Sequence, residues 1–143
     1  MNQSFLHLLL ALLWMPTLLA GLPEIKNLKA DEKVLVEVLY TEPGISTYKY
    51  EFSGKKVTIS HNGKILGKLD ISAEDATKID QYLLTVKRAR RASRNTLGAP
   101  EYTIRHEDSG KLLGTWTYRV DFIDPKESPK PALSLYERRK RIP

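Results

Sequence analysis

Five positively charged side chains crowd the eight residues from 87 to 94, which read KRARRASR. They are Lys87, Arg88, Arg90, Arg91 and Arg94. Ammonium and guanidinium groups donate charge-assisted hydrogen bonds to phosphate and carboxylate oxygens. Like charges this close repel one another, and the favourable interaction of cations with a helix C-terminus accounts for only one or two of them. The surplus predicts a surface that binds an anionic partner.

A second basic run lies near the C-terminus and consists of Arg138, Arg139, Lys140 and Arg141. The whole chain has a net charge of +6, but outside the two runs only 14 of its 23 basic residues remain, against 17 acidic residues. The two runs therefore make an otherwise acidic protein basic. The predicted partner is an anionic polymer, a membrane surface or an acidic protein. Specific nucleic-acid recognition is not expected, because neither run contains the interleaved aromatic residues of single-strand binders.

Three other interpretations stay open. The first run is also typical of the solvated end of a helix. RARR (88–91) and RRKR (138–141) resemble sites cut by proprotein convertases, so the chain could be a precursor that is processed at its basic runs. The third alternative is a secreted protein-recognition or inhibitor module that acts through a sheet edge or through the C-terminal tail.

The sequence contains no recognisable catalytic motif. His61 precedes Asn62-Gly63 and is expected in a solvated turn, while His106 precedes Glu107 in a strand pattern. Adjacent strand residues point to opposite faces, so the second pair is not a ready acid and base. A Gly-rich phosphate loop, G-x-S-x-G and H-E-x-x-H are all missing. These observations favour a non-enzymatic protein and predict neither a cofactor nor a metal site.

Alternating apolar residues predict an α+β fold built on an antiparallel sheet. Five or six strands are expected over 33–40, 46–52, 55–60, 64–71, 101–107 and 112–122, as a meander followed by a hairpin. Asn62-Gly63 is typical of a tight hairpin turn. We expect the strand aromatics to lie mainly in the core: Tyr48, Tyr50, Phe52, Trp116 and Tyr118. No internal repeat of useful length is found.

One amphipathic helix is expected within residues 71–91, packed across one face of the sheet. Ser72 is a suitable N-cap, and the next turn is acidic. An apolar stripe follows, made of Ala76, Ile79, Leu83 and Val86 with Tyr82 at its edge. A helix continued through Arg91 would place Arg90 on this stripe. Either the helix stops packing after about Val86, or the Arg90 side chain reaches outward to water.

The N-terminal residues predict export to the periplasm or the extracellular space. Residues 5–19 are apolar except for His7 and Thr17, and the run is too short to span ~30 Å of hydrocarbon as a helix. We expect a signal peptide at 1–20, cleaved after Ala20 or Gly21, with an uncleaved anchor or a buried first helix as alternatives. A single α+β domain (21–123) and a Pro-rich linker with a short basic tail (124–143) would follow. Because the chain has no cysteine, its core alone must hold it together.

Overall fold

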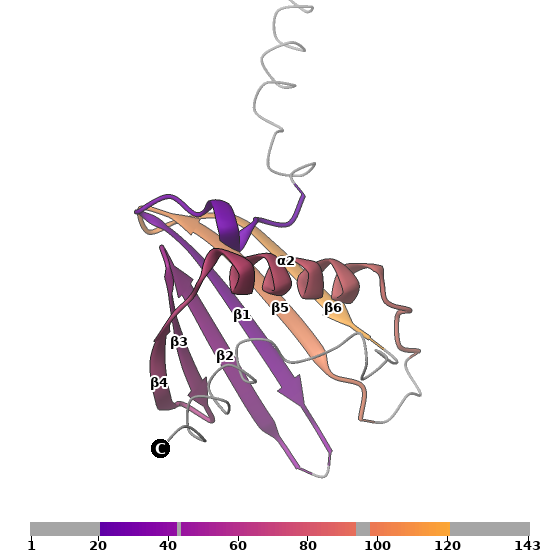
Figure 1. Cartoon of the computed structure of the whole chain (residues 1–143). Helices are drawn as coiled ribbons and strands as arrows, with labels where there is room; N and C mark the ends of the chain where they lie inside the picture. Colours follow the sequence, from indigo (N-terminus) through magenta and orange to yellow (C-terminus); the bar gives the residue numbers. More distant parts are fainter. Residues whose placement is uncertain (1–20, 43, 94–97, 121–143) are drawn as a thin grey trace, which may run out of the picture.

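Six antiparallel strands form one sheet, and one α-helix lies across it, in the computed structural model, which describes residues 21–42, 44–93 and 98–120 (Figure 1). The strands are β1 (Glu32–Tyr40), β2 (Ser46–Ser53), β3 (Lys56–His61), β4 (Lys64–Asp70), β5 (Glu101–Asp108) and β6 (Lys111–Arg119), in the spatial order β4-β3-β2-β1-β5-β6. The α+β class and the antiparallel sheet are thus confirmed, with six strands. The predicted signal peptide (1–20) and the predicted linker and tail (124–143) lie outside the described residues.

The two outer hairpins of the sheet share a six-residue turn and bulge. Residues 62–67 read NGKILG in β3–β4, and residues 109–114 read SGKLLG in β5–β6. Each begins with two residues of positive φ, Asn62 (47°) with Gly63 (80°) and Ser109 (50°) with Gly110 (80°), so the tight turn predicted at Asn62-Gly63 is present. In each hairpin the register then shifts by one residue. This short repeat was not recognised in the sequence.

The bulges lie on the two edge strands. Ile65 pairs with Ser60 and Gly67 with Ile59, so Leu66 is the extra residue of β4, and Leu113 occupies the same place in β6. A bulge bends the strand that carries it and interrupts its ladder of backbone groups. Both edges of this sheet are therefore poor templates for the addition of a further long strand.

The core lies between α2 (Ala73–Arg88) and one face of the sheet. Val34, Val36 and Val38 alternate along β1 and are buried, as their spacing requires of a strand with one covered face. The buried residues of α2 belong to the same apolar cluster: Ala76, Ile79, Tyr82, Leu83 and Val86. Of the aromatics predicted to lie in the core, Tyr50 and Phe52 are buried in this cluster, and Tyr48, Trp116 and Tyr118 pack against it partly buried.

The sequence predicts the start of α2 but not its end. The Ser72 hydroxyl accepts a 3.1 Å hydrogen bond from the backbone N–H of Asp75, as expected of an N-cap. The sequence left the end of the helix open within residues 71–91, and the structure places it at Arg88, with Ala89 extended (φ −61°, ψ 151°). The helix therefore stops before Arg90 reaches its apolar stripe.

The segment before β1 packs beside α2 at the edge of the core. Residues 21–28, called the arm below, contain one turn of 3-10 helix, η1 (Ile25–Asn27). The Asp80 carboxylate accepts hydrogen bonds from the backbone N–H groups of Ile25 (2.6 Å) and Lys26 (3.2 Å). Ile25 itself is only 2% exposed. Partial burial raises the pKa of Asp80, although the two N–H donors oppose the shift.

Substitution of Gly114 by Ala should destabilise the domain. A Cβ atom at Gly114 would lie 2.5 Å from the Trp116 indole, which covers this glycine. Because the indole packs against the core, we expect the free energy of unfolding to fall by about 1–3 kcal/mol. Gly44→Ala is the control, since no atom lies within 4 Å of its Cβ position. Equal urea midpoints for the two variants would contradict the expectation.

The raised pKa of Asp80 predicts a pH-dependent difference between the wild type and Asp80→Asn. The native state binds the Asp80 proton more tightly than the unfolded state, so this group favours folding most below pH ~3.8. The contribution is lost as the pH rises through the native pKa. Asn cannot ionise, so it provides the reference. The difference between the two unfolding free energies, wild type minus Asp80→Asn, should fall between about pH 3 and about pH 7. A difference that rises over this range in urea titrations would refute the assignment.

Candidate functional site

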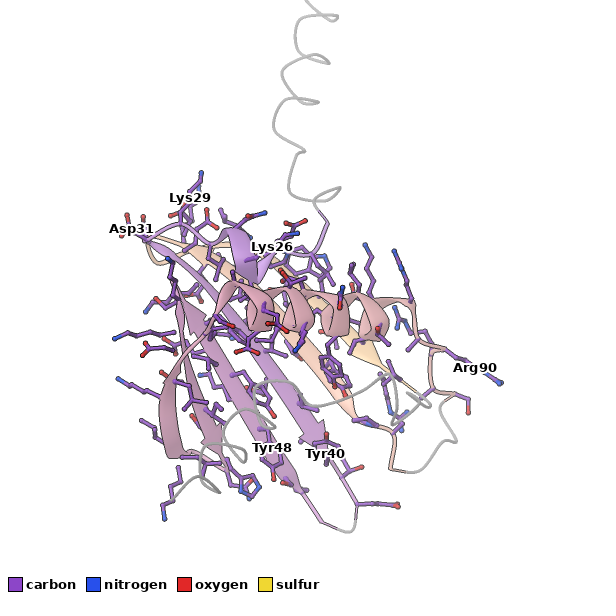
Figure 2. The ribbon with its side chains drawn as sticks, in the orientation of Figure 1. Lys26, Lys29, Asp31, Tyr40, Tyr48 and Arg90 are labelled. Carbon is purple, nitrogen blue, oxygen red and sulfur yellow. The ribbon has the colours of Figure 1, made fainter. Side chains whose placement is uncertain are left out.

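The candidate site is the basic cluster at the C-terminal end of α2. Lys87 and Arg88 are the last residues of the helix, Arg90 and Arg91 follow its cap, and all four are exposed. Figure 2 shows the Arg90 side chain extending away from the domain beyond the end of α2. We use the name basic cluster for Lys87, Arg88, Arg90 and Arg91. The predicted members Arg94, Arg138, Arg139, Lys140 and Arg141 lie outside the described residues.

Arg91 turns back and caps the helix. Its Nη1 donates to the carbonyl oxygens of Val86 and Ala89 (both 3.2 Å), and its Nη2 donates to that of Lys87 (2.7 Å). The last carbonyls of a helix lack intrahelical partners and carry its negative partial charge. The planar guanidinium donates to several of them at once, whereas the ammonium of lysine is a point charge on a flexible stem. Arg91 is thus the cation that compensates the end of α2.

Arg91 also joins the helix to the sheet. Its guanidinium carbon lies 4.4 Å from the ring centroid of Tyr118 on β6, a cation–π distance. The following residues run beside the end of β6: Arg91 forms a β-bridge with Val120, and Ala92 N–H donates to the Arg119 carbonyl oxygen (3.0 Å). Arg119 Nη1 donates in turn to the Ser93 carbonyl oxygen (3.3 Å). The chain that carries Arg90 is therefore held at both ends.

This arrangement differs from the helical continuation considered in the sequence. Lys87 and Arg88 are in the last turn, as their spacing predicted, but Arg91 makes the direct hydrogen bonds to the carbonyls. An extended segment sends neighbouring side chains to opposite sides, so Arg90 and Arg91 diverge. The sequence shows that KRARRASR is basic. It does not show which arginine returns to the helix, because that depends on where the helix stops.

His61 is held by neighbours rather than being free in a turn. Its Nε2 lies 2.8 Å from the Ser46 hydroxyl, and its ring stacks on Tyr48 at 4.3 Å between centroids. The expectation of a solvated turn residue is corrected, because His61 ends β3 opposite Tyr48 of β2. A hydrogen-bonded serine and histidine also occur in nucleophilic enzymes, where a third group orients the histidine. No such third group on His61 is seen among the described residues.

His106 has an acidic partner on another strand. Its Nε2 lies 3.2 Å from Glu32 Oε2, and the two side chains are only 19% and 14% exposed. His106 pairs with Val34 of β1, so Glu32, two residues from Val34, lies on the same face. Sequence inspection considered only the neighbouring Glu107 and missed this contact, because the partners are 74 residues apart. The pair joins β1 and β5 near the end of the covered face.

Two tyrosine hydroxyls meet under the helix. Tyr82 and Tyr102 lie 2.7 Å apart, oxygen to oxygen, and both residues are buried. Burial, and after it the neighbouring Tyr82, raises the pKa of Tyr102 far above the usual range of a phenol. Burial also raises the pKa of Tyr118, against the opposing effect of the Arg91 charge. Both phenols therefore stay neutral, and their contacts suit a structural role: Tyr102 hydrogen-bonds to Tyr82, and the Tyr118 ring lies against the Arg91 guanidinium.

Comparison of the chain with protein-family models, with curated proteins and with solved structures finds no match. Within residues 21–42, 44–93 and 98–120, no helix is long and apolar enough to cross a membrane. The same residues contain no group of three or more His, Cys, Asp or Glu side chains that could hold a metal ion.

Replacement of Arg91 by Ala should cost stability, and replacement of Arg88 should not. The variant Arg91→Ala loses charge-assisted hydrogen bonds to three carbonyls and the contact with Tyr118, so we expect unfolding to become easier by about 1–3 kcal/mol. Arg88→Ala, a substitution of an exposed arginine in the neighbouring last turn of the helix, is the matched control and should stay within about 0.5 kcal/mol of the wild type. Urea unfolding measures both. A similar loss in the two variants would show that Arg91 is not the capping residue.

Proposed function

We propose that this protein is an exported, non-enzymatic domain that binds an anionic partner through the basic cluster. The observation that carries the proposal is that the members of the basic cluster make different contacts. Arg91 compensates the negative end of α2, while Lys87, Arg88 and Arg90 are exposed. Without Arg91 the uncompensated carbonyls would repel an anion at this point. With it, the helix end presents a positive surface.

The attachment to β6 supports a binding role over that of a merely solubilising helix end. Exposed helix ends commonly fray, and their side chains then contribute charge without a fixed geometry. Here the segment after α2 is fixed by the bridge from Arg91 to Val120 and by the hydrogen bond from Ala92 to Arg119. A surface whose backbone is already ordered loses less conformational entropy when it binds. Arg94 and the run Arg138–Arg141 would add further positive charges that contact the same partner.

Two alternatives remain. A protein-recognition module that uses a sheet edge would have to work around the bulges at Leu66 and Leu113, which interrupt both edges. A precursor cut after Arg91 would require the segment to leave β6 and the Arg91 side chain to leave the helix, because proteases cleave accessible, locally opened chain. Intact-mass measurement of the natural protein identifies processing directly.

The test is binding of the purified protein to immobilised dextran sulfate across a salt series. The variant Lys87→Glu/Arg88→Glu/Arg90→Glu should elute at much lower salt than the wild type, because binding to a polyanion falls steeply with salt in proportion to the contacts made. Arg91 is kept, so the helix cap stays intact.

The matched control is Lys55→Glu/Lys64→Glu/Lys68→Glu. It makes the same change in net charge on three exposed lysines around the β3–β4 hairpin. We expect it to elute close to the wild type. If the two triple variants elute together, retention depends on net charge alone and the basic cluster is not a binding site.

A further inference from the structure

A shallow hollow lies between the arm and the outward side of α2. Its volume is about 190 Å³, and its walls come from Leu22, Pro23, Glu24 and Lys26 of the arm and from Thr77, Asp80, Gln81, Leu83 and Leu84 of α2. Leu84 is 40% exposed although most of its helix face is polar. Figure 2 shows Lys26 on the arm, beside α2. The hollow combines apolar walls with an open side toward solvent.

The hollow continues into the basic cluster. Thr77, Gln81 and Leu84 are spaced by four and three residues, and Arg88 follows after four more, so all four share one stripe of the helix. Lys87 lies beside this stripe, one turn beyond Leu84. An apolar depression and two exposed cations are therefore neighbours on the same surface of α2.

The acidic groups of the hollow already have partners. The Asp80 carboxylate accepts two backbone hydrogen bonds, from Ile25 and Lys26. Glu24 Oε2 lies 3.7 Å from the Lys26 ammonium. Among the described residues, neither Lys87 nor Arg88 forms an ion pair. The charge that this surface offers to a partner is positive, at the end of the stripe.

We propose that the hollow and the adjoining cations dock the domain onto the surface of an anionic bilayer, an inference that rests on the proposed function and names its partner. Leu22, Pro23 and Leu84 would enter the boundary between headgroups and acyl chains, and Lys87 and Arg88 would contact lipid phosphates. Surfaces that bind in this way combine apolar area with attraction to anionic lipid. A soluble polyanion would gain nothing from Leu84.

The position of the arm agrees with this orientation. The apolar run of residues 5–19 ends shortly before Gly21, and the arm begins there. While the apolar run is still attached, the arm and the hollow beside it are the described parts closest in sequence to the segment that enters the bilayer. Cations at the edge of the hollow would hold this side of the domain against anionic headgroups.

The experiment is co-sedimentation of the purified protein with vesicles, either of phosphatidylcholine alone or with phosphatidylglycerol added. We expect binding only to the anionic vesicles. Leu84→Asn should weaken that binding about fivefold, since it removes a half-exposed leucine from the contact. Arg88→Gln should weaken it by a similar factor of about five. Leu84→Asn should leave retention on dextran sulfate unchanged.

Leu112→Asn is the matched control for the leucine, because Leu112 is 54% exposed on β6, away from the hollow. It should bind vesicles as the wild type does, and urea unfolding confirms that each variant is folded. Vesicle binding by Leu84→Asn equal to the wild type overturns the docking site while the dextran sulfate result still stands. Equal binding to neutral vesicles, or binding only to an acidic protein, also overturns it. If the wild type binds neither the vesicles nor dextran sulfate, the proposed function is overturned as well.

Discussion

A single layer of apolar contacts between one helix and one face of a six-stranded sheet holds this domain together. The chain has no cysteine, so no disulfide bond contributes to its stability. Val34 and Ile104 from the centre of the sheet and Val86 from the last turns of α2 are among the fully buried side chains of one cluster. Because α2 supplies five buried residues to this core, loosening either end of the helix would expose core residues of the sheet as well.

Polar contacts fix the helix at both ends and on its outward side. Ser72 caps its start, Arg91 caps its end, and Asp80 fastens the arm across it. Arg91 differs from the others because it also reaches Tyr118 and so ties the helix end to the last strand. The C-terminal end of α2 therefore contributes both to stability, through Arg91, and to the proposed binding surface, through the exposed side chains beside it.

Local patterns in the sequence predicted most of the fold. Alternation placed the buried valines of β1, and the Asn62-Gly63 turn and the Ser72 cap follow from backbone chemistry that involves only a few neighbouring residues. The sequence left the end of α2 open because the residues around it all have side chains compatible with a helix: Lys87, Arg88, Ala89, Arg90 and Arg91. The helix stops there because Arg91 donates hydrogen bonds to its last carbonyls and the residues after it pair with the end of β6. Both contacts are tertiary.

The same distinction explains the candidate site. Composition alone identified the basic cluster, but the role of Arg91 depends on Tyr118 and on three carbonyls whose position is set by the helix end. The contact between Glu32 and His106 and the hollow beside Leu84 join segments distant in sequence. Such contacts follow from strand register and from the docking of the arm, and neither is encoded in a short window of residues.

The two polar fastenings of α2 respond differently to acid. A guanidinium keeps its charge at every pH at which a protein stays folded, so the Arg91 cap and the positive surface beside it are insensitive to acidity. The carboxyl of Asp80 is half-buried and binds a proton more tightly in the folded chain than in the unfolded one, so its protonation favours the docked arm. Acidification would therefore leave both contacts in place, and the contribution of Asp80 to holding the arm would be smallest near neutral pH.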